Sequence, residues 1–397
     1  MNPREIPSYE TEPMPNLLIS DHPTRSAWIE IDIGRLRNNL AMLTKHKPKG
    51  VHFLSVVKDA AYGHGALPVA RAALAAGAAF LALTTLEEAD ALRRAGIRCP
   101  ILMLGEREES ELPWCVEHNL TICVSEPKVV AALAKLAAEA NRRLPVHLKV
   151  NTGMNRYGIR WTEAPALARL IDNYKSLNLE GVLSHFAMSD EPDKTFAQLQ
   201  LERLRQVLAQ MEQQGVQTKY RHICNSGGFL DLPEAHLNMV RIGILQYGVY
   251  PSKTCRRLPG IEPTMSVKAR VSALQHLQPG DTVGYGMRYQ ASTPRRIAVI
   301  PAGYGDGYPR VRNQGWVLLG GHRAPVVGGV AMDAFMVDIT DHPEVQVGHE
   351  AVLMGRQGAE EISVHDLAQW KSTVSYEVLT GWRSRLPRVY INGGATA

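Results

Sequence analysis

Short apolar runs alternate with helix-like stretches over the first two thirds of the chain. Each run has the length of a buried strand, and the stretches between them are amphipathic or rich in alanine. The predicted strands are 53–57, 80–83, 100–104, 120–124, 146–150, 179–185, 222–225 and 239–245. Steady alternation of strand and helix predicts a parallel sheet, and about eight such units predict a closed TIM-type (β/α)8 barrel.

A different pattern begins near Pro259, where helical periodicity fades and Gly and Pro turns separate short β-rich runs. We predict a flexible N-terminal extension at 1–26, a barrel at 27–258 and a β-rich domain at 259–397, with a helical insertion at 364–372. An open, doubly wound sheet is the alternative to the barrel. No GxGxxG follows the first strand, which argues against a dinucleotide site.

Composition narrows the function classes. The 397 residues carry a formal net charge of only +5, and their Lys and Arg residues are scattered, so we expect no nucleic-acid partner. No apolar run reaches the roughly eighteen residues that span a bilayer, and the N-terminus lacks a signal-peptide pattern. The five cysteines show no CxxC spacing, which is typical of reduced thiols. We expect a cytoplasmic protein with no membrane partner.

Lys58 is the first residue that points to chemistry. It ends the apolar run 53–57 and is followed by Tyr62, Gly63 and Gly65. Burial lowers the pKa of a lysine and leaves a neutral amine that attacks carbonyls, of which the aldehyde of pyridoxal phosphate (PLP) is the obvious one. The tyrosine and the glycine amides suit its phosphate. A strand-end lysine whose head reaches solvent is the simpler reading of Lys58 taken alone.

Further polar side chains lie at or near the ends of the predicted strands. They are Lys149, Arg156, His185, His222, Ser226 and Arg241. Because the carboxyl ends of barrel strands surround one site, we expect these side chains to lie near Lys58. One such residue would mean little, but this many at matching ends predict a single site.

Together these motifs resemble those of the alanine racemase family. The run KDAAYGHG at 58–65 is similar to the family's cofactor-lysine motif, and the other motifs follow in the family's order from about Ala27 to Val389. The resemblance implies a PLP-dependent isomerase that interconverts L-alanine and D-alanine with two bases, in a homodimer with shared active sites. It also implies a supply of D-alanine for peptidoglycan precursors of the cell wall.

The resemblance implies the cofactor contacts as well. Lys58 would bind the cofactor, and its phosphate would be bound by Tyr62, Ser226 and the amides of Gly243 and Ile244. His185 and His222 would lie beside Arg241.

Arg241 is the most informative of these residues. Most PLP enzymes place a carboxylate at the pyridine nitrogen, which makes the ring a strong electron sink. An arginine cannot accept a proton, so it leaves that nitrogen unprotonated and makes side transamination less favourable, which is how the family is held to work. A structural ion pair is the alternative for Arg241 taken alone.

The second base and the substrate contacts are also implied by the resemblance. Lys58 would be the base on one face of the substrate's α-carbon. Tyr285, from the partner subunit, would be the base on the other face. The pKa of this tyrosine must then fall from about 10, with help from His185. Arg156 would reach the substrate carboxylate, and Lys149 matches a lysine that is carbamylated in many members. In the β-rich domain, the gate and carboxylate-binding residues would be Tyr304, Met332 and Asp333.

Two positions depart from the family pattern. Asp59 directly follows the lysine, and Ala60 takes the usual place of the acidic or amide residue. Ser384 stands where the family has a tyrosine that touches the phosphate and narrows the entrance. Serine lacks the ring, so we expect a looser cofactor grip and room for serine besides alanine as a substrate.

Two other functions remain as alternatives. A PLP-dependent amino-acid decarboxylase of the same barrel type would have an acid at the pyridine nitrogen and a catalytic cysteine in the β-rich domain. Arg241 and the absence of cysteines after Cys255 argue against it, whereas release of carbon dioxide would favour it. A non-catalytic PLP-binding protein would lack the β-rich domain and Tyr285, and would not exchange the α-proton of alanine with solvent.

Overall fold

The computed structural model describes residue 23 and residues 25–393. This part of the chain forms two compact units: a barrel unit, made of Asp32–Met265 and Ser363–Trp382, and a β-rich unit, made of 25–31, Ser266–Ile362 and Arg383–Asn392. The predicted extension at 1–26 falls almost wholly outside the described residues. None of the helices in the described part has the length and apolar character needed to cross a membrane.

The barrel unit is built on a parallel sheet that curls into a ring. Among the described residues, eight strands follow the order β10-β2-β3-β4-β5-β6-β8-β9, and β7 pairs with β6 at the side. Backbone hydrogen bonds from Arg241 N to Cys224 O (3.0 Å) and from Asn238 N to Arg221 O (3.4 Å) bring the two ends of this order together. The prediction of a TIM-type barrel is confirmed. The strands are β2 His52–Val56, β3 Phe80–Leu83, β4 Ile101–Met103, β5 Thr121–Val124, β6 Leu144–Asn151, β7 Ile159–Arg160, β8 Leu177–Leu183, β9 Tyr220–His222 and β10 Met239–Ile242.

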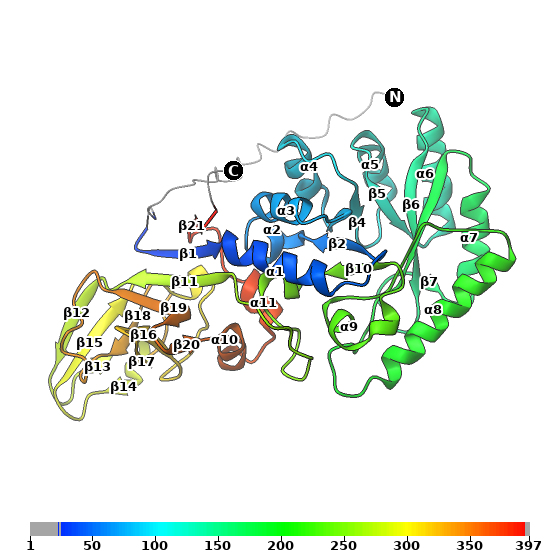
Figure 1. Ribbon diagram of the computed structural model, residues 1–397. Helices are drawn as coiled ribbons and strands as arrows, with labels where there is room; N and C mark the ends of the chain where they lie inside the picture. Colours follow the sequence, from blue (N-terminus) through cyan, green and yellow to red (C-terminus); the bar gives the residue numbers. More distant parts are fainter. Residues whose placement is uncertain (1–22, 24, 394–397) are drawn as a thin grey trace, which may run out of the picture. The chain divides into compact units, whose positions relative to one another are not determined.

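Helices lie outside this ring (Figure 1). The helix α7 shows why they form: Ala164, Leu167, Ala168 and Ile171 recur at helical spacing and are all buried on one face. The helices of the unit are α1 Ile33–His46, α2 Lys58–Tyr62, α3 Ala66–Ala75, α4 Leu86–Arg94, α5 Leu112–Glu117, α6 Pro127–Glu139, α7 Ala164–Asp172, α8 Thr195–Gln213, α9 Ser226–Asp231, α10 Val364–Lys371 and α11 Ser375–Thr380. Short 3-10 turns are η1 Glu109–Glu111, η2 Pro233–Ala235 and η3 Ile244–Tyr247.

The β-rich unit contains a mostly antiparallel sheet in the order β12-β15-β18-β17-β16-β19-β11-β1-β21, with β20 on β19 and a separate β13–β14 pair. The predicted β-rich domain is therefore confirmed as a fold class. Its strands are β1 Ala27–Asp32, β11 Met265–Arg270, β12 Ala273–Leu277, β13 Thr282–Val283, β14 Tyr289–Gln290, β15 Arg295–Ile300, β16 Trp316–Leu319, β17 His322–Val327, β18 Phe335–Asp338, β19 Glu350–Gln357, β20 Glu360–Ile362 and β21 Arg388–Ile391; its 3-10 turns are η4 Tyr285–Met287 and η5 Tyr304–Asp306.

Two segments belong to a unit other than the one whose predicted range contains them. The predicted barrel range 27–258 contains β1, and the predicted β-rich range 259–397 contains α10 and α11. The strand β1 belongs to the β-rich sheet, where Ile29 N donates to Pro387 O across 2.9 Å. The helices α10 and α11 belong to the barrel unit, where Tyr376 lies with its ring centroid 6.2 Å from that of Tyr62. Pairings between such distant parts of the chain leave no mark on local periodicity, so hydrophobic patterning could not place these segments.

Candidate active site

Lys58 follows β2 and begins an unusual turn. The next four residues, Asp59, Ala60, Ala61 and Tyr62, all have φ between 49° and 56°, the left-handed region. This conformation costs roughly 1–2 kcal/mol per non-glycine residue, so other contacts must hold it. One is the Asp59 N–H, which donates to Glu88 Oε1 at the start of α4. Burial, followed by the charge of Arg156, lowers the pKa of Lys58.

The end of β2 is fixed from the η3 turn. Gln246 Nε2 donates to Val56 O across 2.9 Å, its Oε1 accepts from Ser55 Oγ at 2.7 Å, and Tyr247 Oη donates to Val56 O at 3.0 Å. These bonds satisfy polar groups that would otherwise be costly inside the barrel. They also set the position of the backbone from which Lys58 emerges.

Tyr62, Ser226 and Gly243 form a small cluster of polar groups. Ser226 Oγ accepts from the amides of Gly243 (3.1 Å) and Leu245 (3.4 Å). A Cβ at Gly243 would lie 2.7 Å from Tyr62 Oη, so only glycine allows that hydroxyl to come so close. The ring of Tyr62 packs against Tyr247, with centroids 5.2 Å apart. Two hydroxyls and the backbone amides of Gly243 and Leu245 thus gather at one turn, and groups of these kinds suit an anion such as a phosphate.

Arg241 is buried among neutral partners. Its Nη1 contacts His222 Nδ1 at 3.1 Å, and its Nη2 contacts His185 Nδ1 at 2.9 Å. Nη2 also donates to the carbonyls of Ser184 (2.8 Å) and Ile223 (3.1 Å). Burial lowers the pKa of this guanidinium to about 10, which leaves it charged at neutral pH.

The charge on Arg241 dictates the tautomers of both histidines. A guanidinium only donates, so each Nδ1 must accept and be unprotonated. Burial and the neighbouring positive charge hold the pKa of His185 and of His222 well below the ordinary value, so both rings are neutral. We therefore assign the proton of each ring to Nε2, which makes that atom of His185 a hydrogen-bond donor.

Lys149 and Arg156 line a small cavity together with Thr152, Ser184 and His185. Burial, then the charge of Arg241, lowers the pKa of Lys149 to about 7. A large fraction of its amine is thus neutral near pH 7. A neutral amine can react with electrophiles such as carbon dioxide, and this chemistry distinguishes Lys149 from an ordinary strand-end lysine.

The β-rich unit gathers the residues predicted to face substrate around a buried carboxylate. Asp306, which is fully buried, accepts from Arg25 (2.5 Å) and from the Gly303 amide (3.0 Å). The Tyr304 amide donates to Ala331 O at 3.1 Å, which joins η5 to the segment containing Met332. Arg385 forms ion pairs with Asp306 and Asp333, and this brings the neighbouring, exposed Ser384 to the same surface.

Tyr285 stands at the tip of the turn between β13 and β14. It is flanked by Gly284 and Gly286, both with φ near 70°, and its side chain is 85% exposed. The base of the turn is anchored by the buried Val283, which packs in a cluster with Ile297 and Val327. The turn thus carries a large aromatic side chain that the described part of the chain leaves uncovered.

Sequence reasoning missed several residues that the structure connects to these groups. His147 Nδ1 lies 2.9 Å from His222 Nε2, and Glu180 Oε1 lies 3.4 Å from His147 Nε2. His147 sits two residues before Lys149 on β6 and so shares its face, which is a signal that alternation along a strand could have provided. No comparable signal identified Gln246.

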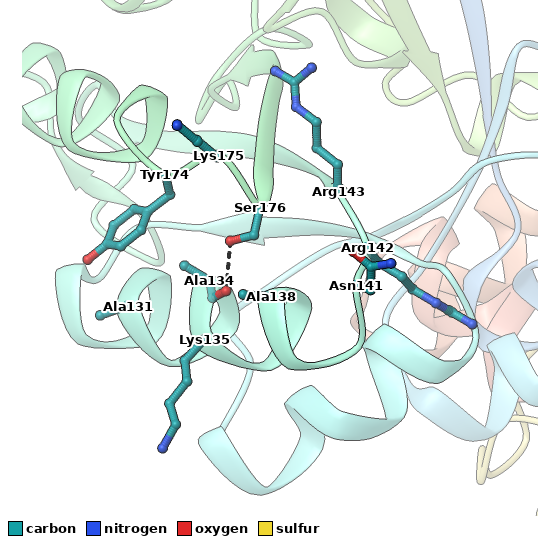
Figure 2. A pocket seen from close by; sticks show the side chains of 10 residues that line it. All are labelled: Ala131, Ala134, Lys135, Ala138, Asn141, Arg142, Arg143, Tyr174, Lys175 and Ser176. Atoms are coloured by element: carbon teal, nitrogen blue, oxygen red, sulfur yellow. Dashed lines mark hydrogen bonds between the residues drawn. The ribbon is translucent and has the colours of Figure 1, made fainter.

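A groove of about 700 Å³ lies elsewhere on the barrel unit, along α6 and the segment before β8 (Figure 2). Its basic residues are Lys135, Arg142, Arg143 and Lys175. Arg142 and Arg143 precede β6 and Lys175 precedes β8, so the groove is at the amino ends of the strands, opposite Lys58. Figure 2 shows the charged groups pointing away from one another around an alanine-rich floor, which leaves no converging set of functional groups. No group of three potential metal-ligating side chains occurs among the described residues either.

Comparison with known proteins agrees with this geometry. Residues 31–251 match the family described as alanine racemase, N-terminal domain, and residues 264–390 match alanine racemase, C-terminal domain. The chain is 38% identical over 370 residues to an alanine racemase of Halothermothrix orenii (93% of this chain, 98% of that protein) and 41% identical over 353 residues to one of Syntrophobacter fumaroxidans (89% and 94%).

Solved structures show the same similarity over the whole fold. An alanine racemase of Clostridium difficile 630 superposes with a TM-score of 0.88 at 30% identity, covering 93% of this chain and 96% of that one. The alanine racemase of Bacillus anthracis with bound L-Ala-P gives 0.86 at 35% identity, with coverage of 93% and 96%. With both family domains matched in order and relatives similar over almost their full length, the chain belongs to the alanine racemase family.

Proposed function

We propose that the protein interconverts L-alanine and D-alanine with PLP and two bases, Lys58 and Tyr285. The observation that carries this proposal is the environment of Arg241, a buried guanidinium that meets two neutral imidazoles and no carboxylate among the described residues. Such a group donates to a ring nitrogen without protonating it. This arrangement suits proton transfer at one carbon and not transamination.

The barrel residues fit PLP. Lys58 has the lowered pKa that an amine needs to bind an aldehyde carbon. The cradle of Tyr62, Ser226 and the Gly243 amide, into which a Cβ at Gly243 would intrude, suits the phosphate, and the Ile244 amide would extend it. When bound, PLP supplies an electron-withdrawing ring that stabilises negative charge on the substrate's α-carbon.

The two bases act on opposite faces of the substrate. Starting from L-alanine, Tyr285 Oη takes the proton as the α-carbon–hydrogen bond breaks, and Lys58 Nζ donates a proton to the other face; D-alanine uses the reverse assignment. For Tyr285 to act as a base, its phenolate must be stabilised. His185 can provide this, because its Nε2–H is a donor and Arg241 places a positive charge behind the ring.

Substrate binding would use Arg156 of the barrel and, from the second subunit, the segment of the β-rich domain that contains Met332. Arg156 would bind the substrate carboxylate through a bidentate contact. The neutral fraction of Lys149 supports carbamylation, which would convert a repulsive neighbour of Arg156 into an anion that orients it. Tyr304 would gate the entrance, with Asp333 supporting the Met332 amide at the substrate carboxylate.

The 85% exposure of Tyr285 supports a homodimer. A general base works poorly in bulk water, and this side chain has no covering of its own. A second copy of the chain would bury it and complete each active site. We also place the enzyme in the cytoplasm, where D-alanine would enter peptidoglycan synthesis for the cell wall.

Solvent deuterium exchange tests the catalytic proposal. Incubation with L-alanine in D2O is expected to give deuterium at the α-position together with D-alanine, and Lys58→Ala should abolish both. Reduction with borohydride should fix the cofactor to Lys58 and change the absorption spectrum of the purified protein. Exchange that is absent despite bound cofactor would contradict catalysis, and release of carbon dioxide would instead identify a decarboxylase.

A further inference from the structure

Arg241 carries a buried charge that no neighbouring acid balances. Its four contacts are two imidazoles and two carbonyls, and among the described residues no carboxylate lies within ion-pair distance of it. The nearby ionisable side chains Lys149 and Arg156 are also basic. An isolated buried charge is costly, so the fold must balance it in another way.

Two directed hydrogen bonds lead from Arg241 through His222 to His147, which lies beside an acid. Since His222 accepts at Nδ1, its proton is on Nε2, which donates to His147 Nδ1 across 2.9 Å. Burial keeps His147 neutral by lowering its pKa, so its own proton is on Nε2. That atom has no hydrogen-bond partner, but Glu180 Oε1 lies 3.4 Å away. Both hydrogen bonds therefore donate in the direction away from the guanidinium, and the last proton lies on the His147 nitrogen next to Glu180.

The backbone of β8 is adapted to the contact between Glu180 and His147. Val146 pairs with Leu179 and His147 pairs with Gly181, so Glu180 is the extra residue of a β-bulge in β8. Bulges redirect side chains next to functional sites. A Cβ at Gly181 would lie 2.5 Å from the ring of His147, so the ring occupies space that only glycine leaves open. The side chain of Glu180 is 17% exposed and that of His147 is fully buried.

We propose that Glu180 is a positioning residue for Arg241, and that its carboxylate acts as the counter-charge of the buried guanidinium through His147 and His222. This series of contacts stabilises the charged form of Arg241 and holds its donor atoms in one orientation. Its importance for catalysis rests on the proposed function, in which Arg241 meets the pyridine nitrogen. The electrostatic linkage itself does not depend on that function.

A double-mutant cycle on the full-length protein tests the linkage. Glu180→Gln keeps an acceptor but removes the charge, and we expect it to lower the melting temperature by about 2–4 °C with and without bound cofactor. In an Arg241→Met background the same replacement should cost less than half as much. Asp90→Asn is the matched control, because Asp90 is 20% exposed and pairs with Arg94, which is not part of the contacts between Arg241 and Glu180. This replacement should change the melting temperature equally in both backgrounds. Equal losses for Glu180→Gln in both backgrounds would overturn the proposal.

Histidine 15N resonances give a second readout that does not need the Arg241 variant to fold. Glu180→Gln should shift the Nε2 resonance of His147 and also that of His222, whereas His236, which contacts Phe229 O, should stay unchanged. Glu180→Asp should restore part of both shifts. If the His222 resonance stays fixed while that of His147 shifts, the charge of Glu180 does not act on His222 through His147, and the proposal is refuted. Racemase assays run in parallel distinguish the proposed electrostatic linkage from the proposed function. Activity in a protein that shows no coupling between Glu180 and Arg241 rejects only the linkage. Coupling in a protein that shows no activity rejects only the proposed function.

Discussion

Arg241 Nη2 lies 2.9 Å from His185 Nδ1, and this one contact decides what the histidine can do. Because the guanidinium cannot accept, His185 is a neutral ring whose remaining proton is on Nε2. It can therefore donate to a phenolate but cannot remove a proton from a phenol. The arrangement suits His185 to stabilise a phenolate, such as that of the proposed base Tyr285, and not to act as a base itself.

Replacing His185 should slow catalysis if its side chain assists the proposed tyrosine base. His185→Leu removes a charge-assisted hydrogen bond worth about 1.5–3 kcal/mol, so kcat/KM for alanine should fall about 10–100-fold. The acidic limb of the pH–rate profile should also move to higher pH, because the phenolate of the proposed tyrosine base then loses a stabilising donor. His185→Gln keeps a donor, so its kcat/KM should lie between those of wild type and His185→Leu. An unshifted profile in the leucine variant would argue against the role assigned to His185.

Lys149 gives a prediction for stability against pH. Burial lowers its pKa in the folded state to about 7, whereas an unfolded lysine titrates near 10.4. Between these values the unfolded state binds more protons, so the contribution of Lys149 to stability rises with pH over this window, by at most about 1.4 kcal/mol per unit. Below pH 7 both states are protonated and the full penalty of the buried charge remains.

Denaturant unfolding of wild type and Lys149→Met from pH 6 to 10 tests this. The difference in free energy of unfolding should change in favour of wild type as the pH rises, provided bicarbonate is excluded. Adding 13C-labelled bicarbonate should produce a carbamate carbon signal in wild type that the methionine variant lacks. A pH-independent difference would show that Lys149 is not perturbed by burial.

The barrel followed from local pattern, and so did the grouping of polar residues at the strand ends. A parallel barrel brings the carboxyl ends of its strands together, so Lys58, His185 and Arg241 could be grouped from their places after apolar runs alone. The left-handed turn after Lys58 could not be predicted, because Ala60 and Ala61 do not favour positive φ and the contact of the neighbouring Asp59 amide with Glu88 comes from another helix.

Other features were hidden for the same physical reason. The bulge that sets Glu180 against His147 is a property of paired strands, and the alternation of a single strand does not reveal it. The helix α11 lies against the turn after Lys58, where a Cβ at Gly63 would be 2.6 Å from Leu379 O, although more than three hundred residues separate them. The individual roles of Tyr285, Arg156 and Ser384 stay predictions from the resemblance.

Gly181 provides a steric test of the histidine chain. Its backbone conformation suits any residue, but the Cβ of alanine would lie 2.5 Å from the His147 ring. Gly181→Ala should therefore displace that ring and cost about 1–3 kcal/mol of unfolding free energy. Gly329→Ala is the control, since its Cβ would meet only Arg312 Cγ at 3.8 Å and should change stability little. Equal stability of the two variants would contradict tight packing around His147.

Ser384 offers a test of substrate breadth. The residue is exposed beside Arg385, whose ion pair with Asp333 ties it to the segment containing Met332. If the missing tyrosine ring leaves space near the substrate side chain, Ser384→Tyr should lower kcat/KM for serine more than for alanine and tighten cofactor retention on dialysis. Ser384→Ala removes the hydroxyl without filling the space, so it should keep the wild-type ratio of the two substrates. If the tyrosine variant also keeps that ratio, another side chain such as Trp382 limits the pocket, and Ser384 does not control which amino acids the enzyme accepts.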